Sequence, residues 1–310
     1  MTSFVLIRLL RASATLAIVL AVAFFVLRLS GDAALETLSI DAPSEALIAF
    51  RAHWGLDEPL SRQFISYVRS VLTGDFGRSM RDGRPAAELV AECVPITLAI
   101  TLPALLLGVA LGAPAGVYAA LRPGTGFDRC VMFAAVAGFS TPSFVLGLVL
   151  VWIFSVSFGW LPSGGATNWR YGVLPILTLA PSGAGTLARF IRNAMLDVLS
   201  QDYIRTATAK GVPWRRIVLR HALPNAAIPT VTVMGFMIGQ LIAGSVVVES
   251  VFSWPGVGRL LAVSVASRDF AVVQCVLLLV TLTMITANMS VDLLYAILDP
   301  RMRRERGTAR

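Results

Sequence analysis

Few residues in this chain have types and spacings that could support catalysis. A phosphate-binding loop of the GxxxxGK[ST] kind needs a lysine after a glycine, but the sole lysine, Lys210, follows Ala209 and precedes Gly211. The two histidines, His53 and His221, lie in unrelated settings, and no GxSxG turn marks a nucleophilic serine. We therefore predict no catalytic residue and no ATP hydrolysis by this chain itself.

The cysteines offer no metal site either. Cys93, Cys130 and Cys275 lie far apart, and only two histidines could join them, so neither a metal-ligand spacing nor a disulfide framework is visible. We interpret them as small apolar side chains. The sequence predicts no metal and no cofactor bound by this chain.

Three polar residues at the ends of apolar runs invite a proton-relay interpretation. Asn288 and Asp292 share a helix face at i and i+4 spacing, and Glu249 ends another run. An ion-coupled secondary transporter or channel needs an ionisable group held within the bilayer, and their position near span ends argues against that role. This class stays the alternative hypothesis, with a membrane scaffold or enzyme as a third.

The elements that carry these residues are predicted to be membrane helices. The chain of 310 residues is 56% hydrophobic and only 14% charged, with a mean hydropathy of +0.75, so lipid must cover much of it. A bilayer core needs roughly 20 apolar residues at helical rise. We predict an all-α protein with six spans and no charge at mid-depth, over residues 9–29, 96–121, 131–158, 173–191, 227–248 and 272–298.

Charge sets the expected orientation. The net charge of +8 gathers in short segments between apolar runs with no interleaved aromatic residues, which favours a membrane topology signal over nucleic-acid binding. We expect both termini on the cytoplasmic side and a retained first span, since the chain near residue 30 makes a poor signal-peptide cleavage site. The sequence therefore divides into four predicted regions: an N-terminal span (1–30), an external segment that contains an amphipathic helix (31–93), a five-helix core (94–299) and a basic tail (300–310).

Small residues mark two helix faces. Two overlapping GxxxG steps occur in the second span and one in the fifth, and absent side chains let helix backbones approach closely. Helix packing within the subunit or against a partner is the predicted use, although a substrate path could also exploit the space. The residues are Gly108, Gly112, Gly116, Gly235 and Gly239.

The segment 197–225 between the fourth and fifth spans reads as a helical elbow. Gly211 can take the left-handed conformation that ends a first short helix, and Pro213 can occupy the first turn of a second. In that second helix Trp214, Val218 and other apolar residues share one face and arginines the other. The physics alone leaves anionic lipid and a docking protein as equal partners.

This elbow resembles the cytoplasmic signature of ABC importer permeases, EAA, three residues, Gly, nine residues, I-x-L-P. Ala207, Gly211, Leu223 and Pro224 match it, whereas Arg205, Thr206 and His221 replace the Glu, the first Ala and the Ile; the peptide-permease variant RTAxAKG fits better. Further segments, including LTGDFGRSM, HALPNAAIPTVT and VVESVFSWPGVGRL, are similar to the B-type subunit of the dipeptide, oligopeptide and nickel permeases.

The resemblance implies a bacterial inner-membrane, multi-pass subunit that forms a heterodimeric pore with a second homologous permease. It also implies two cytoplasmic ATPase subunits, which use ATP and Mg, an external solute-binding protein, and a peptide or nickel-like cargo. Alternating access would follow from ATP-driven movement of the elbow. The residues expected to couple to the ATPase are Arg205, Thr206, Ala207, Ala209, Lys210, Gly211, Val212, Pro213, Trp214, Leu223 and Pro224.

Overall fold

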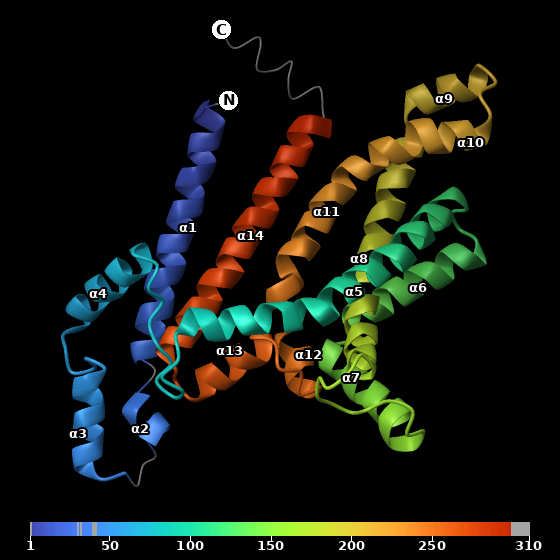
Figure 1. Ribbon diagram of the computed structural model, residues 1–310. Coiled ribbons are helices and arrows are strands. Elements are labelled where there is room, and N and C mark those ends of the chain that lie inside the picture. The colour runs from blue at the N-terminus through green and yellow to red at the C-terminus, as the bar shows by residue number, and fades with distance from the viewer. Residues whose placement is uncertain (1, 30, 32, 39–41, 299–310) are drawn as a thin grey trace. The chain divides into compact units, whose positions relative to one another are not determined.

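The computed structural model describes residues 2–29, 31, 33–38 and 42–298 (Figure 1). Every regular element in these ranges is helical, which confirms the predicted all-α class. The predicted basic tail, 300–310, lies outside the described residues. Two compact units divide the chain: Met1–Thr97 with Pro255–Ile285, and Leu98–Trp254 with the chain from Thr286 onward.

The first unit is held together by aromatic side chains between its first helix and a short amphipathic helix. Phe24 on α1 lies with its ring centroid 5.1 Å from Phe64 and 5.7 Å from Tyr67, both on α4. The helical spacing seen in this stretch of the sequence therefore does form a helix whose apolar face is packed. The unit contains α1 (Thr2–Leu29), α2 (Ala33–Leu38), α3 (Ser44–His53), α4 (Leu60–Leu72), α13 (Val257–Ala266) and the first parts of α5 (Ala86–Leu121) and α14 (Phe270–Leu298).

The second unit is built around α8, which contacts α6, α7 and α11. Leu187 and Met195 on α8 are fully buried and pack in one core with Ala222 and Ala226. This packing places α8 at the centre of the helices that follow and precede it. The elements are α6 (Gly126–Ser140), α7 (Ser143–Leu150), the π-helix η1 (Val151–Ser157), α8 (Arg170–Leu199), α9 (Asp202–Ala209), α10 (Trp214–Ile217), the π-helix η2 (Val218–Ala222), α11 (Leu223–Ala243) and α12 (Val246–Val251).

Five of the six predicted spans coincide with helices long and apolar enough to cross a bilayer. These are Leu6–Leu29, Ala86–Leu121, Arg170–Leu199, Trp214–Val251 and Phe270–Val291 among the described residues. All five begin before the predicted start, and the third and fourth of them also end later than predicted. Ala86–Leu121, for example, has 36 residues, about 54 Å at helical rise, which exceeds the bilayer core of about 30 Å.

The third predicted span, 131–158, is wrong as one continuous helix. Gly126–Ser140 and Ser143–Ser157 are bent by 99° relative to each other, and six spans result only if this pair counts as one. The break lies at Thr141, whose backbone is extended with φ −78° and ψ 120°, followed by Pro142. A proline disfavours the helical conformation of the residue before it, so the helix ends there despite the apolar composition.

Glycines in the second unit lie where helix backbones meet. A Cβ added to Gly116 on α5 would lie 2.5 Å from the carbonyl oxygen of Ala188 on α8, and one added to Gly108 would lie 3.3 Å from that of Ala180. A Cβ on Gly112 would contact Ala184 more closely still. In α11 a Cβ on Gly235 would meet the side chain of Val291, and Gly239 is buried. These contacts need helices without side chains at the crossing.

Replacing Gly116 by alanine should destabilise this contact. The added methyl group must push α5 away from the α8 backbone, at a cost of about 1–3 kcal/mol in the free energy of unfolding. Gly126→Ala is a matched control, because a Cβ there meets nothing within 4 Å and the residue has no positive φ. Thermal unfolding of the purified chain in detergent would measure both, and equal melting temperatures would contradict the role of Gly116.

Candidate functional site: a helical elbow and an uncharged cavity

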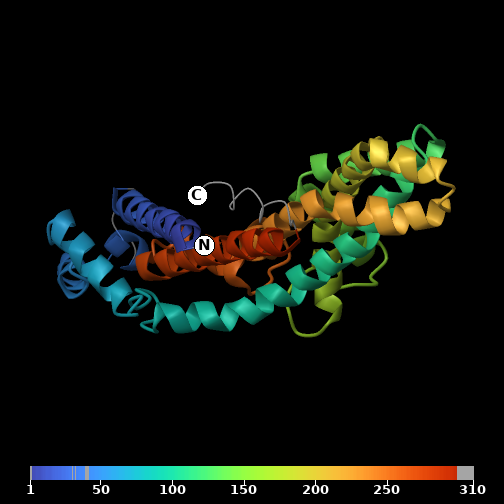
Figure 2. The ribbon, with the colours of Figure 1, turned by 90° about the horizontal axis from the view of Figure 1, so that it is seen from above.

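The connection between α8 and α11 forms the sharp elbow that the sequence predicts. Gly211 has φ +73°, and backbone hydrogen bonds from Gly211 N to Thr208 O (3.0 Å) and from Val212 N to Ala207 O (3.2 Å) end α9. A left-handed glycine closing a helix in this way is a common helix stop. Figure 1 shows α9 and α10 side by side beyond the end of α8, and Figure 2 shows the same pair from above.

The second arm of the elbow differs from the predicted separate short helix. Pro213 lies just before α10 with ψ 136° rather than inside its first turn, and from Trp214 the helix runs on to Val251. Leu223 and Pro224 therefore lie inside a continuous helix. The π-helix Val218–Ala222 ends two residues before Pro224, and such a wide turn accommodates a residue that lacks an N–H and crowds the preceding turn.

One face of the elbow is anchored and the other is exposed. Ile204, Ile217 and Val218 are buried, which fixes both arms against the second unit. Trp214, predicted on the apolar face, is instead 51% exposed, and Leu219 is 60% exposed. Of the remaining predicted coupling residues, Ala207, Val212 and Leu223 are half-buried, and the exposed ones are Arg205, Thr206, Ala209, Lys210, Gly211, Pro213 and Pro224.

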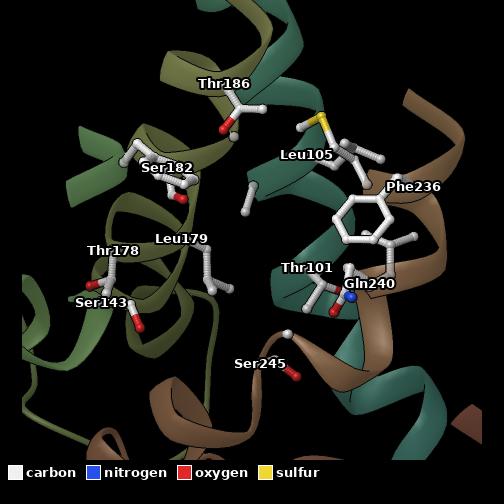
Figure 3. A pocket seen from close by; sticks show the side chains of 16 residues that line it. Thr101, Leu105, Ser143, Thr178, Leu179, Ser182, Thr186, Phe236, Gln240 and Ser245 are labelled. Carbon is white, nitrogen blue, oxygen red and sulfur yellow. The ribbon is translucent and has the colours of Figure 1, made fainter. Parts of the chain in front are cut away.

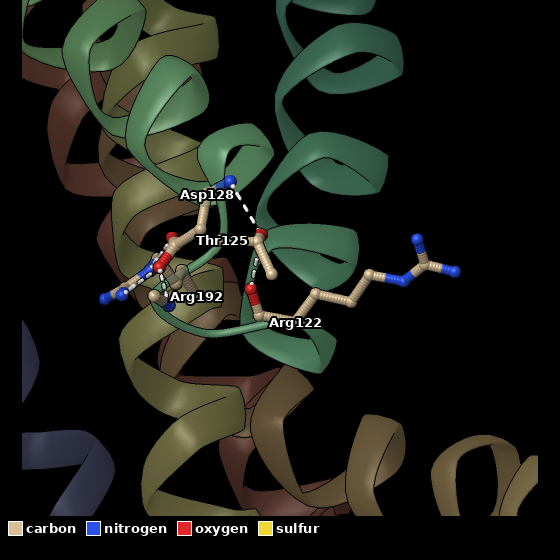
Figure 4. Close-up of polar contacts among 5 residues, drawn as sticks. Arg122, Thr125, Asp128 and Arg192 are labelled. Carbon is tan, nitrogen blue, oxygen red and sulfur yellow. Dashed lines mark hydrogen bonds and ion pairs between the residues drawn. The ribbon is translucent and has the colours of Figure 1, made fainter.

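A partly buried ion pair holds α8 about two turns before its last residue, Leu199 (Figure 4). Arg192 on α8 donates from Nε to Asp128 Oδ1 at 2.5 Å and from Nη2 to Oδ2 at 2.8 Å, and Asp128 is 3% exposed. Gly124 N also donates to Asp128 Oδ2 at 2.9 Å, and Thr125 Oγ1 accepts from Asp128 N at 3.3 Å. The pair ties the α5–α6 connection to α8.

Sequence reasoning missed this ion pair. The available signal was the helix-start pattern in which Thr125 precedes Asp128 by three residues, with each stabilising the first turn of a helix. Nothing in a single sequence shows that Arg192, 64 positions later, reaches the same carboxylate.

A cavity of about 350 Å³ lies among α5, α7, α8 and α11 of the second unit (Figure 3). Figure 3 shows side chains of α7 and α8 on one side of it and side chains of α5 and α11 on the other. None of its lining residues is charged. Its polar groups are hydroxyls and one amide, from Thr101, Ser143, Thr178, Ser182, Thr186, Gln240 and Ser245.

Of the three residues considered for a proton relay, the structure describes the side chains of Glu249 and Asn288. Glu249 is fully buried in α12 and accepts a hydrogen bond from Ser245 Oγ at 2.8 Å. Asn288 is exposed on α14, and the side chain of Asp292 lies outside the described residues. No group of three or more His, Cys, Asp or Glu side chains that could hold a metal ion occurs in the described part of the chain.

Apolar helices long enough to cross a bilayer, with an uncharged cavity among some of them, are features that membrane transport proteins share. A family model described as "Binding-protein-dependent transport system inner membrane component" matches residues 112–304, and a model for the N-terminal part of such components matches residues 1–101. The chain belongs to this family of inner-membrane components.

Full-length relatives carry the same assignment. The chain is 46% identical over 304 residues to the glutathione transport system permease protein GsiC of Salmonella choleraesuis (strain SC-B67), covering 98% of this chain and 99% of the relative. It is 45% identical to GsiC of Escherichia coli (strain K12) over the same coverage. The chain is thus an ABC importer permease of the peptide and nickel type in the inner membrane, and ATP hydrolysis belongs to separate subunits.

A solved structure shares the fold. A chain of the MetNI methionine ABC transporter, in an inward-facing conformation, aligns with a TM-score of 0.55 and 22% identity, over 68% of this chain and 96% of that chain. At this identity the likeness concerns the fold alone.

Removing the Asp128 carboxylate should loosen the end of α8. Asp128→Ala leaves the Arg192 guanidinium, whose side chain is 21% exposed, without its bidentate partner, and we expect a loss of about 2–3 kcal/mol in the free energy of unfolding. Asp202→Ala is the matched control, since its pair with Arg205 spans 3.7 Å with side chains 97% and 77% exposed, and such pairs contribute little. Denaturant unfolding in detergent would measure the free energy of unfolding of both variants. Equal losses for Asp128→Ala and Asp202→Ala would contradict the predicted role of the Asp128–Arg192 pair.

Proposed function

We propose that this chain forms half of a translocation pore for peptides, including glutathione-like peptides, and that its elbow receives force from an ATPase subunit. The alternative cargo in this proposal is a related ligand such as a nickel complex. The pore would be completed by a second homologous permease, with two cytoplasmic ATPase subunits that use ATP and Mg and an external solute-binding protein. The elbow at Gly211, in a chain of this family, is the observation that carries the proposal.

The elbow is suited to docking another protein because it is rigid on one side and open on the other. Buried Ile204 and Ile217 hold both arms, so a push on the exposed face moves α8 and α11 together. The exposed face combines a large aromatic ring, Trp214, with Arg215 and Arg216. Tryptophan and arginine are the residues that most often dominate protein interfaces, which favours protein over lipid as the partner.

We further propose that the elbow and both termini face the cytoplasm, with 31–93 on the other side. Arginines concentrate in the segments assigned to the cytoplasm, as the positive-inside rule requires. A thiol introduced at Ser200, with the three native cysteines replaced by alanine, would then react with impermeant reagents only from the cytoplasmic side. External labelling at Ser200 would reverse the orientation.

Gly211 gives a direct test of coupling. Its φ of +73° strains a β-branched side chain, whereas asparagine tolerates this conformation, and a Cβ there meets nothing within 4 Å. Gly211→Val should therefore distort the elbow and lower ATP-driven uptake about tenfold or more in the reconstituted complex, while Gly211→Asn keeps most of it. ATP hydrolysis that continues without uptake would identify uncoupling. Full uptake by Gly211→Val would rule out this role.

Cargo can be tested at the cavity. Glutathione carries a net negative charge and trialanine none, and the wild-type complex should take up both in an ATP-dependent manner because no lining charge excludes either. Ser182→Asp places a carboxylate at the cavity and should lower glutathione uptake roughly tenfold relative to trialanine, by like-charge repulsion. Ser182→Asn is the matched uncharged control. If the wild-type complex took up neither peptide, the proposed cargo would be refuted. If Ser182→Asp lowered the uptake of glutathione and of trialanine equally, the cavity would not lie on the path of the cargo.

A further inference from the structure

A second cavity, of about 360 Å³, lies entirely within the first unit and takes no part in the proposed transport path. It is formed by the last turn of α1, the loop between α3 and α4, α4 itself, the loop 75–80 and the first turn of α14. Its volume falls within the usual range of small-molecule sites, about 300–1,000 Å³. Unlike the cavity of the second unit, it has charged groups on its wall.

Arg28 makes two contacts beside this cavity. Its Nε donates to Gln63 Oε1 at 2.6 Å, and its guanidinium lies 3.8 Å from the centroid of the Phe24 ring. Gln63 is fixed in turn, since its Nε2 donates to the carbonyl oxygens of Leu56 at 3.1 Å and Glu58 at 2.8 Å. These contacts hold the Nε end of the guanidinium and leave Nη1 without a hydrogen-bond partner among the described residues.

Three donors on the wall of this cavity are buried without a hydrogen-bond partner among the described residues. They are Arg28 Nη1, Tyr67 Oη and Gln274 Nε2, and the whole Gln274 residue is only 5% exposed. Burial raises the pKa of Tyr67 above its ordinary value, with Arg28 opposing the shift, so the hydroxyl stays protonated and able to donate. An unpaired buried donor is costly, and three on one cavity wall call for an acceptor.

We propose that this cavity binds the carboxylate of an amino acid or short peptide, with Arg28, Tyr67 and Gln274 as donors. A carboxylate only accepts hydrogen bonds, which matches a cluster of donors. The cavity wall also carries Glu58 and Asp75, which suit the ammonium group of the same ligand, and a second arginine, Arg78. The three donor atoms are enclosed, so binding requires these side chains to turn toward the ligand.

Binding to the isolated chain tests the site without any transport assay. In nanodiscs, calorimetry should detect the dipeptide Ala-Phe, and its C-terminal amide, which has no negative charge and has a donor NH2 group in place of one acceptor oxygen, should bind at least tenfold more weakly. Because the assay needs no partner, its failure would leave the transport proposal standing, and failure of uptake would leave this site standing. No binding of Ala-Phe at millimolar concentration, equal binding of the amide, or equally tight binding of inorganic phosphate would overturn the proposal.

Tyr67→Phe separates a binding role from a structural one. The change removes an unpaired buried hydroxyl, so the free chain should unfold at a higher temperature while its affinity for Ala-Phe falls roughly fivefold. Tyr118→Phe, on α5 of the second unit, is the matched control and should change neither. A more stable Tyr67→Phe chain with unchanged affinity would show that the hydroxyl faces no ligand and would overturn the assignment.

Discussion

The second unit depends on how closely α8 can approach its neighbours. Gly108, Gly112 and Gly116 bring α5 against the α8 backbone, and Gly185 on α8 itself brings α6 close, with a Cβ there only 2.5 Å from Ala135 O. In a bilayer, apolar side chains gain little by turning from lipid toward another helix, so association rests on close packing and hydrogen bonds. Glycine at these crossings supplies that closeness. The position of α8 then determines both the cavity and the start of the elbow.

Much of this arrangement follows from local sequence signals. Apolar run length predicts five spans because a bilayer imposes one length on every helix. Gly211 predicts its own backbone conformation, since few other residues adopt positive φ readily. These features depend on single residues or on composition, so a single sequence contains them.

Other features depend on residues that are distant in sequence or on local competition, and these were missed. The bend at Thr141 lies in an apolar run. The hydropathy of this run predicts one membrane span, but Pro142 disfavours a helical backbone at Thr141, and the helix ends there. Pro224, by contrast, does not end its helix. The π-helix Val218–Ala222 accommodates it, so the helix continues from α10 into α11. The Asp128–Arg192 pair and the donors around Arg28 become visible only when distant segments are placed together.

The described charges of the second unit lie away from the lining of its cavity. Near lipid a charged side chain is tolerated where a partner compensates for its lost hydration. Asp128 meets this condition through Arg192, and the buried Glu249 accepts a hydrogen bond from Ser245. The Asp128 pair joins two helices, the Glu249 bond is local to one segment, and the polar groups that line the cavity are hydroxyls and the Gln240 amide. Such groups can donate to or accept from a peptide backbone whatever its side chains, so the lining of this cavity offers no charge-based selection among peptides.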